Sequence, residues 1–303
     1  MNPVSLISPL LALVFAPLLP GVINRVKAIF AGRTGQPLLQ PYFDLAKLLR
    51  KGAVYSSTTT WIFRAGPVIG LAAVVAATAL VPLGGIPAPL AFPGDPVLFI
   101  YLLGLMRFFT VVAALDTGSS FEGMGASREV TFSALAEPAL FLGLAAVARQ
   151  TSNLSVSGIM AGVTTELWIR SMPALTLVAA VLLVVLLAEN SRIPVDDPNT
   201  HLELTMVHEV MVLDHSGPDL AFILYSAGLK LWLLGALLVG VVVPVRTGKV
   251  WLDMSAALGG MIAVAALIGV VESSMARLRL VRVPQLLVAA GALAAFALIM
   301  VLR

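Results

Sequence analysis

The chain has 303 residues, of which 59% are hydrophobic and only 12% charged, with a net charge of +3. A soluble globular domain carries roughly 25% charged residues, so this composition excludes one and predicts an integral membrane protein. Because the chain has no cysteine, disulfides, thiolate metal sites and cysteine-ligated iron–sulfur clusters are excluded, and we expect no metal or redox cofactor of its own. Its basic residues flank hydrophobic segments, a pattern that indicates membrane topology and not nucleic-acid binding.

Hydrophobic windows of roughly 20 residues, long enough to cross a bilayer, recur along the whole chain. They predict an all-α, polytopic fold in a single transmembrane domain, residues 1–303. The eight predicted spans are 4–24, 65–83, 97–115, 130–148, 172–190, 220–243, 254–272 and 283–301. The first span lacks a preceding basic region, so we expect a retained helix and not a cleaved signal peptide.

Lysine and arginine are distributed unequally between the two sets of connecting segments. Twelve lie in segments 24–64, 116–129, 191–219 and 272–282, and five lie in the other segments or at the C-terminus. By the positive-inside rule, the first set is cytoplasmic and both termini lie outside. We therefore expect a multi-pass protein of the inner (cytoplasmic) membrane, with cytoplasmic loops near 24–64, 116–129 and 191–219 available for docking.

Within the first cytoplasmic segment, apolar residues recur at helical spacing from Tyr42 to Leu49. Asp44 and Lys47 lie on the largely opposite face. This pattern predicts a short amphipathic helix on the membrane surface.

Two basic residues, Arg107 and Lys230, fall about midway along the third and sixth predicted spans. A charge at such depth costs about 2.5–3.5 kcal/mol and normally faces a partner inside the bundle. Candidate partners are Glu137, Glu189 and Glu272. We expect a buried track suited to proton movement, formed by Glu129, Glu137, Glu189, Glu272, Arg107 and Lys230. The alternative is that these are structural ion pairs, or side chains that snorkel from helix ends.

The segment between the fifth and sixth spans is charged, punctuated by proline and contains all three histidines. It cannot lie in hydrocarbon, so we expect a solvated or protein-covered loop. Asn199 or Thr200 can cap a helix here, and the spacing of seven between His201, His208 and His215 would place the histidines roughly along one face. That spacing is too long for two ligands of one metal ion, which favours a docking surface.

Three motifs carry a resemblance that covers nearly the whole chain: QPxxDxxKLL at 40–49, ExxRxPxDxP at 189–198 and the histidine-rich run 201–219. They resemble the subunit 1 family of respiratory NADH dehydrogenase, and most closely its branch in membrane-bound group 4 nickel–iron hydrogenases of the formate hydrogenlyase and hydrogenase-4 type. Asp196 and Glu203 match acidic positions shared with the NADH dehydrogenase branch. Asn199 and His201 replace two carboxylates of that branch, a departure that favours a hydrogenase over a quinone site.

The resemblance implies a complex I-like membrane anchor and coupling subunit without catalytic residues, which docks a peripheral hydrogenase arm and links electron transfer to proton or sodium translocation. Its implied partners are the hydrogenase large and small subunits, ferredoxin-like iron–sulfur subunits, antiporter-like membrane subunits and the lipid bilayer. The [NiFe] centre and iron–sulfur clusters are expected in those partners. The residues expected to face the docked arm are Asp44, Lys47, Arg192, Asp196, Asp197, His201, Glu203, His208, Glu209 and Asp214.

Two other functions remain open at this point. One is the quinone-site subunit of an NADH:quinone oxidoreductase-like complex. The other is an independent ion carrier, which the lack of internal repeats disfavours.

Overall fold

The computed structural model describes residues 3–196 and 206–302. Within these ranges the chain is a bundle of helices without a β-strand, apart from one isolated bridge between Leu83 and Ile86. Seven of the described helices are long and apolar enough to cross a membrane, or up to eight spans when a bent N-terminal pair counts as one. The predicted polytopic all-α fold is therefore confirmed.

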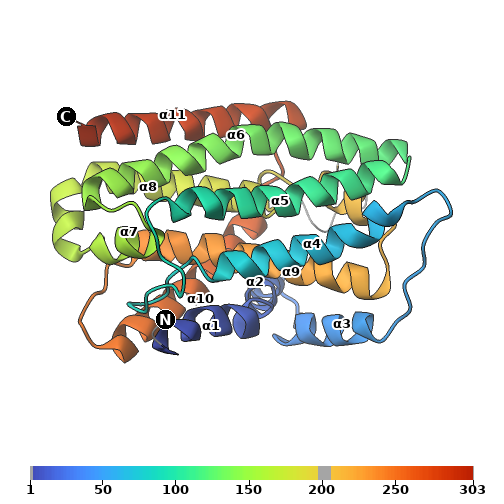
Figure 1. Cartoon of the computed structure of the whole chain (residues 1–303), viewed down its shortest axis with the longest axis horizontal. Helices are drawn as coiled ribbons and strands as arrows, with labels where there is room; N and C mark the ends of the chain where they lie inside the picture. The colour runs from blue at the N-terminus through green and yellow to red at the C-terminus, as the bar shows by residue number, and fades with distance from the viewer. Residues whose placement is uncertain (1–2, 197–205, 303) are drawn as a thin grey trace.

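Most of the long helices run side by side along one direction (Figure 1). They are α4 (Trp61–Thr78), α5 (Asp95–Asp116), α6 (Ser120–Thr151), α8 (Thr165–Glu189), α9 (Gly217–Val242), α10 (Val250–Ser274) and α11 (Val283–Leu302). The shorter elements are η1 (Pro3–Leu6), α1 (Ile7–Phe15), α2 (Leu18–Phe30), α3 (Gln40–Leu49), α7 (Val156–Gly162), η2 (Glu209–Val212) and η3 (Leu280–Arg282).

The first predicted span is not one straight helix, because the chain bends by 46° between α1 and α2. Pro17 stands at this bend and has no backbone N–H, so it cannot donate to the carbonyl of Leu13. The Tyr225 hydroxyl of α9 donates to that carbonyl instead, at 2.7 Å, and the Tyr42 hydroxyl of α3 donates to the carbonyl of Val14 at 2.5 Å. Two distant tyrosines thus satisfy backbone groups that the bend leaves without helical partners.

The predicted amphipathic helix is confirmed as α3, which packs against α9 and α2. Its polar residues Asp44 and Lys47 are exposed. Phe43 and Leu49 are also more than half exposed. The helix therefore leaves apolar surface uncovered, as expected of a helix that contacts lipid.

The segment 116–129, predicted as a loop, is mostly helical, because α6 begins at Ser120. The polar start of this helix packs against η2, where Gly125 leaves room for the side chain of Val210. A Cβ atom at Gly125 would lie 2.3 Å from Val210 Cγ1 and 2.8 Å from the Val207 carbonyl oxygen. Helix packing against a covering segment extends α6 well beyond its hydrophobic window.

Helix α9 is the central helix of the bundle. In its most apolar window 78% of the residues are buried, against 22% for α11, which lies at the edge. Its neighbours include α4, α8 and α10. Because Lys230 lies on α9, its ammonium group is placed in the interior and not toward lipid.

Candidate functional site

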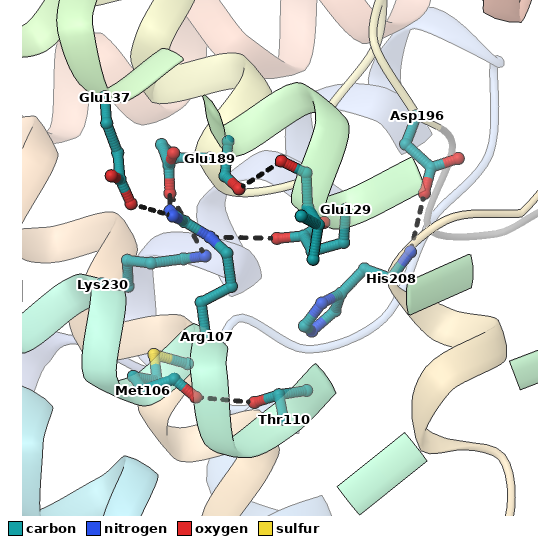
Figure 2. Close-up of polar contacts among 11 residues, drawn as sticks. Met106, Arg107, Thr110, Glu129, Glu137, Glu189, Asp196, His208 and Lys230 are labelled. Carbon is teal, nitrogen blue, oxygen red and sulfur yellow. Dashed lines mark hydrogen bonds and ion pairs between the residues drawn. The ribbon is translucent and has the colours of Figure 1, made fainter. Parts of the chain in front are cut away.

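Arg107, on α5, binds three carboxylates at once (Figure 2). Its Nε lies 3.5 Å from Glu129 Oε1, and its two terminal nitrogens donate to Glu137 and Glu189. The planar guanidinium offers donors in three directions, so each carboxylate is met by a different nitrogen. Glu129 and Glu137, eight residues apart on α6, therefore share one helix face, as predicted.

Lys230 completes this group from α9. Its Nζ lies 3.9 Å from Glu189 Oε2, and the residue is only 5% exposed. The structure thus brings together the predicted residues Arg107, Lys230, Glu129, Glu137 and Glu189, here called the Arg107 cluster. Four different helices supply its members: α5, α6, α8 and α9.

The charges of the Arg107 cluster do not balance. Two basic groups oppose three carboxylates, so full ionisation gives 2 − 3 = −1. Net charge is costly where water is excluded, and one proton bound among the three carboxylates makes the cluster neutral. The arrangement is therefore suited to hold a single exchangeable proton.

Exposure differs among the three carboxylates. The side chain of Glu137 is 39% exposed, whereas those of Glu129 and Glu189 are 11% and 5% exposed. Glu137 is thus the member of the cluster that reaches the outer surface of the bundle. A proton could enter or leave the cluster at this residue.

Glu272, predicted to join Arg107 and Lys230, forms its ion pairs with other residues. Its Oε2 lies 2.8 Å from Lys27 Nζ, and its Oε1 lies 3.3 Å from Arg192 Nη1. The prediction was wrong because α10 packs against α2, which brings the end of α10 to Lys27. Lys27 was missed because the first span was predicted to end at residue 24, whereas α2 continues to Phe30.

Asp196, expected to face a docked partner, is instead 3% exposed and internally bonded. One of its oxygens lies 2.9 Å from Arg277 Nη2. The other accepts the backbone N–H groups of Val207 at 3.1 Å and His208 at 3.3 Å. Its carboxylate therefore ties residue 196 to residues 207 and 208 and is not available to a partner.

The predicted helix with histidines along one face is wrong over the described residues 206–216, which contain only the 3₁₀ turn η2. Met206, Val207, Val210 and Met211 are each at most 2% exposed and anchor this segment against the bundle. Their spacing of i, i+1, i+4 and i+5 would fit one face of an α-helix, but the backbone forms only a 3₁₀ turn at Glu209–Val212. The apolar side chains of residues 206–212 thus pack this segment against the bundle, and the segment is not an amphipathic docking helix.

The two described histidines point to different places. The imidazole of His208 points toward Glu129 and Arg107 (Figure 2). Burial, with the positive charges of Lys230 and Arg107, lowers the pKa of His208 to about 4. His215 stacks on Phe63 with ring centroids 3.9 Å apart, and burial lowers its pKa to about 4. Both histidines are therefore neutral at pH 7, and neither belongs to an exposed docking face.

The other residues predicted to dock a partner fall into three groups. Asp44, Lys47 and Asp214 are exposed, whereas Arg192 and Glu209 are partly buried. Asp197, His201 and Glu203 lie outside the described residues.

Glu122, in the first turn of α6, was not predicted as a site residue. It is 2% exposed, and its Oε2 has no hydrogen-bond partner in the described part of the chain. It precedes Glu129 by seven residues, which places both on one side of α6. That spacing was the available signal, and the prediction of a loop at 116–129 concealed it.

The fold and the site together define a multi-pass membrane protein with a cluster of ionisable side chains inside its helix bundle. The chain belongs to the NADH dehydrogenase family, whose model matches residues 3–303. The resemblance inferred from the three motifs is thereby confirmed.

Two similar proteins come from Escherichia coli (strain K12). Formate hydrogenlyase subunit 4 is 30% identical over 287 residues, which cover 93% of this chain and 92% of that protein. Hydrogenase-4 component C is 31% identical over 242 residues, covering 79% and 75%. A subunit of the NADH-quinone oxidoreductase of Anaplasma phagocytophilum (strain HZ) is 28% identical over 187 residues, covering 57% and 54%.

A solved structure, that of the membrane-bound sulfane sulfur reductase, an archaeal respiratory membrane complex, contains a chain with the same fold. The two chains superpose with a TM-score of 0.80 at 20% identity, covering 98% of each.

Proposed function

We propose that this chain is the membrane anchor and coupling subunit of a complex I-like, membrane-bound nickel–iron hydrogenase. In this proposal a peripheral arm with the [NiFe] centre and iron–sulfur clusters sits on the cytoplasmic loops, and antiporter-like subunits flank the chain in the inner membrane, with both its termini outside. The names of the two E. coli relatives support a place in such a complex. Because the chain has no cysteine, cysteine-ligated redox centres belong to the partners.

The observation that carries the proposal is the Arg107 cluster with its unbalanced charge. Glu189 ends α8, so the cluster reaches the start of the segment on which the arm is proposed to sit. Asp196 and Arg192 hold that segment to the bundle through Arg277 and Glu272. A charge change or movement in a seated partner would therefore alter the field at Glu189 and the affinity of the cluster for its proton.

Glu137 gives this proton a lateral route. As the most exposed carboxylate of the cluster, it faces outward from the middle of α6. A neighbouring membrane subunit seated there could exchange the proton with Glu137. Proton or sodium translocation would then take place in that neighbour, and this chain would supply the link.

The test begins with the complex purified through an affinity tag on this chain. We expect a nickel–iron large subunit among the co-purified proteins, and hydrogen evolution with a reduced electron donor. Reconstituted in sealed vesicles, the Glu137→Gln complex should retain its subunits and its hydrogen evolution but lose coupled ion uptake. Repeating the assay with and without sodium identifies the ion.

Glu166→Gln is the matched control, because Glu166 is an exposed carboxylate at the start of α8. It should leave coupled uptake unchanged. Ion uptake by the Glu137→Gln vesicles equal to that of the control would contradict the coupling role. Absence of a hydrogenase subunit from the purified complex would contradict the assignment to a hydrogenase.

A second candidate, a quinone site, is favoured by a cavity of about 250 Å³ between α2, α3 and α9. Polar groups of Asn190, Arg192 and Tyr225 line it beside apolar side chains. Quinone-dependent turnover that Arg192→Ala abolishes would replace the hydrogenase proposal by this one. Under our proposal the complex evolves hydrogen, and added quinone is not reduced.

A further inference from the structure

Two adjoining hollows lie at the end of the bundle where α6 and α11 end and α8 begins. Figure 1 shows this end of the bundle on the left, with the mark for the C-terminus. The first, of about 530 Å³, is largely apolar and includes Val97, Phe141, Leu144 and Leu298 in its lining. This volume falls within the roughly 300–1,000 Å³ of typical ligand pockets. Its walls come from α5, α6, α7 and α11. In a membrane-spanning bundle, such an apolar groove opens toward lipid chains.

The second hollow, of about 620 Å³, is polar and basic. It lies between the end of α6, the start of α8 and the end of α11, and both Arg149 and Arg170 line it. Arg149 and Ser152 line both hollows, so the basic hollow continues directly into the apolar groove. Together they form one site with a basic mouth and an apolar interior.

Local backbone structure places the two arginines at this mouth. Arg149 is in the last turn of α6, which ends where Ser152 adopts a left-handed conformation with φ of 54°. Arg170 precedes Ser171, the non-helical residue inside α8, and Pro173 follows two residues later. The ends and breaks of helices thus bring basic side chains of α6 and α8 to the same hollow.

The polar groups of the mouth lack partners within the described part of the chain. Neither Arg149 nor Arg170 forms an ion pair there, and both side chains are exposed. Gln150, which also lines the basic hollow, has a buried Oε1 without a hydrogen-bond partner in the same part of the chain. Two arginines without an ion pair beside an apolar groove match an occupant that is anionic at one end and hydrocarbon at the other.

We propose that this site binds one anionic diacyl phospholipid, with its phosphate between Arg149 and Arg170 and one acyl chain along the groove between α6 and α11. The site lies near the ends of spanning helices, where lipid head groups are found. An apolar helix of a partner protein would fill the groove but leave both arginines without a counter-charge. The lipid is therefore the occupant that matches both halves of the site.

The experiment uses the full chain purified from vesicles that contain equal parts of dioleoyl-phosphatidylglycerol and dioleoyl-phosphatidylcholine. Native mass spectrometry counts the lipids that remain bound. Wild type should retain phosphatidylglycerol in preference to phosphatidylcholine. An arginine near the membrane surface contributes roughly a fivefold preference for anionic lipid, so Arg149→Gln and Arg170→Gln should each lower retention about fivefold, and their combination by more.

Lys249→Gln is the control, because Lys249 is an exposed basic residue in the connection that follows α9 at the same end of the bundle. It should retain lipid like wild type. Ala145→Phe, a substitution in the lining of the apolar groove, should lower retention of both lipids while the arginines remain. Unchanged tryptophan fluorescence verifies that each variant is folded.

Four outcomes would overturn the proposal. Equal retention of the two lipids by wild type would remove the role of charge, and retention by the double arginine variant equal to that of Lys249→Gln would remove the role of these two residues. Density of a partner polypeptide in the groove of the assembled complex would show a protein interface instead. Binding of inorganic phosphate by a chain that retains no lipid would also count against a lipid site.

Discussion

Replacing Arg107 by glutamine is the most informative perturbation of the buried charges. It removes the group that contacts Glu129, Glu137 and Glu189, and leaves Lys230, which pairs with Glu189, as the one remaining cation of the cluster. The formal charge of the cluster changes from −1 to 1 − 3 = −2. The side chains of Glu129 and Glu189 are then left in a poorly solvated interior with one shared cation.

The magnitude follows from this geometry. Removal of one partner from a buried ion pair typically destabilises a protein by about 3–5 kcal/mol, because the other charge stays buried without compensation. Glu137 adds little to this estimate, because its side chain is 39% exposed and solvent screens it. The expected loss of unfolding free energy is therefore about 3–5 kcal/mol, which lowers the melting temperature by roughly 10 °C.

Intrinsic tryptophan fluorescence can follow the unfolding of the purified chain, since Trp232 is 3% exposed on α9 and lies two residues from Lys230. Arg33→Gln is the control, because Arg33 is exposed and forms no ion pair among the described residues. Arg107→Gln combined with Glu189→Gln should recover part of the loss, since two neutral amides replace an unpaired charge. A melting temperature of Arg107→Gln equal to that of Arg33→Gln would refute this account of the cluster.

Three further predictions concern the segment 206–216. The pKa of His215 is lowered from 6.5 to about 4 in the folded chain, so the imidazole binds a proton more readily in the unfolded chain. The free energy of unfolding should therefore fall by up to about 3 kcal/mol as the pH drops from about 6.5 to about 4. His215→Phe keeps a ring on Phe63 and should remove the His215 share of this dependence in unfolding curves measured across that pH range. The share of His208, whose pKa is also lowered to about 4, should remain. Gly125→Ala places a Cβ atom 2.3 Å from Val210 Cγ1 and should destabilise the chain by about 1–3 kcal/mol. The control Gly123→Ala, whose Cβ atom meets nothing within 4 Å, should not destabilise it. Equal melting temperatures of these two variants would contradict the contact between Gly125 and Val210. Asp196→Asn loses the ion pair with Arg277 and weakens two backbone hydrogen bonds, so hydrogen exchange of the Val207 and His208 amides should accelerate. Asp44→Asn is the control. Exchange rates equal in the two variants would show that Asp196 does not hold the segment.

Much of the bundle was predictable because hydrophobic length and charge depth are local properties of the sequence. Arg107 and Lys230 stood out because a charge in the middle of a hydrophobic run requires a partner. Glu129 and Glu137 could be placed together because their spacing of eight returns to the same side of a helix. The main cluster was therefore within reach of sequence reasoning, apart from the geometry that joins its four helices.

The errors arose where distant contacts decide local structure. The carbonyl groups freed by the bend at Pro17 accept hydrogen bonds from Tyr42 and Tyr225, which lie far along the sequence. The partner of Glu272 is Lys27 because of the packing of α10 on α2. Neither the hydropathy of a window nor the spacing of charges contains that information.

Asp196 and His208, in the segment after α8, were predicted to face a docked partner for a related reason. The charges of this segment suggested a solvated or protein-covered loop, but its apolar residues Met206, Val207, Val210 and Met211 are buried against the bundle. A charged residue such as Asp196 can be buried when backbone N–H groups and an arginine satisfy it. The pattern of charge along the chain does not reveal which carboxylates find such partners.

The short turn after α8 connects the two groups of buried charges. Glu189 binds Arg107, and three residues later Arg192 binds Glu272, which also pairs with Lys27. The turn between them is held by hydrogen bonds from the Arg192 N–H to the Leu187 carbonyl at 2.8 Å and from the Asp196 N–H to the Arg192 carbonyl at 3.2 Å. Glu189 and Arg192 are the first and last residues of this four-residue turn. A displacement of the turn would therefore change both sets of ion pairs together. Under the proposed function, this connection is the physical route by which a partner over the segment acts on the proton of the Arg107 cluster.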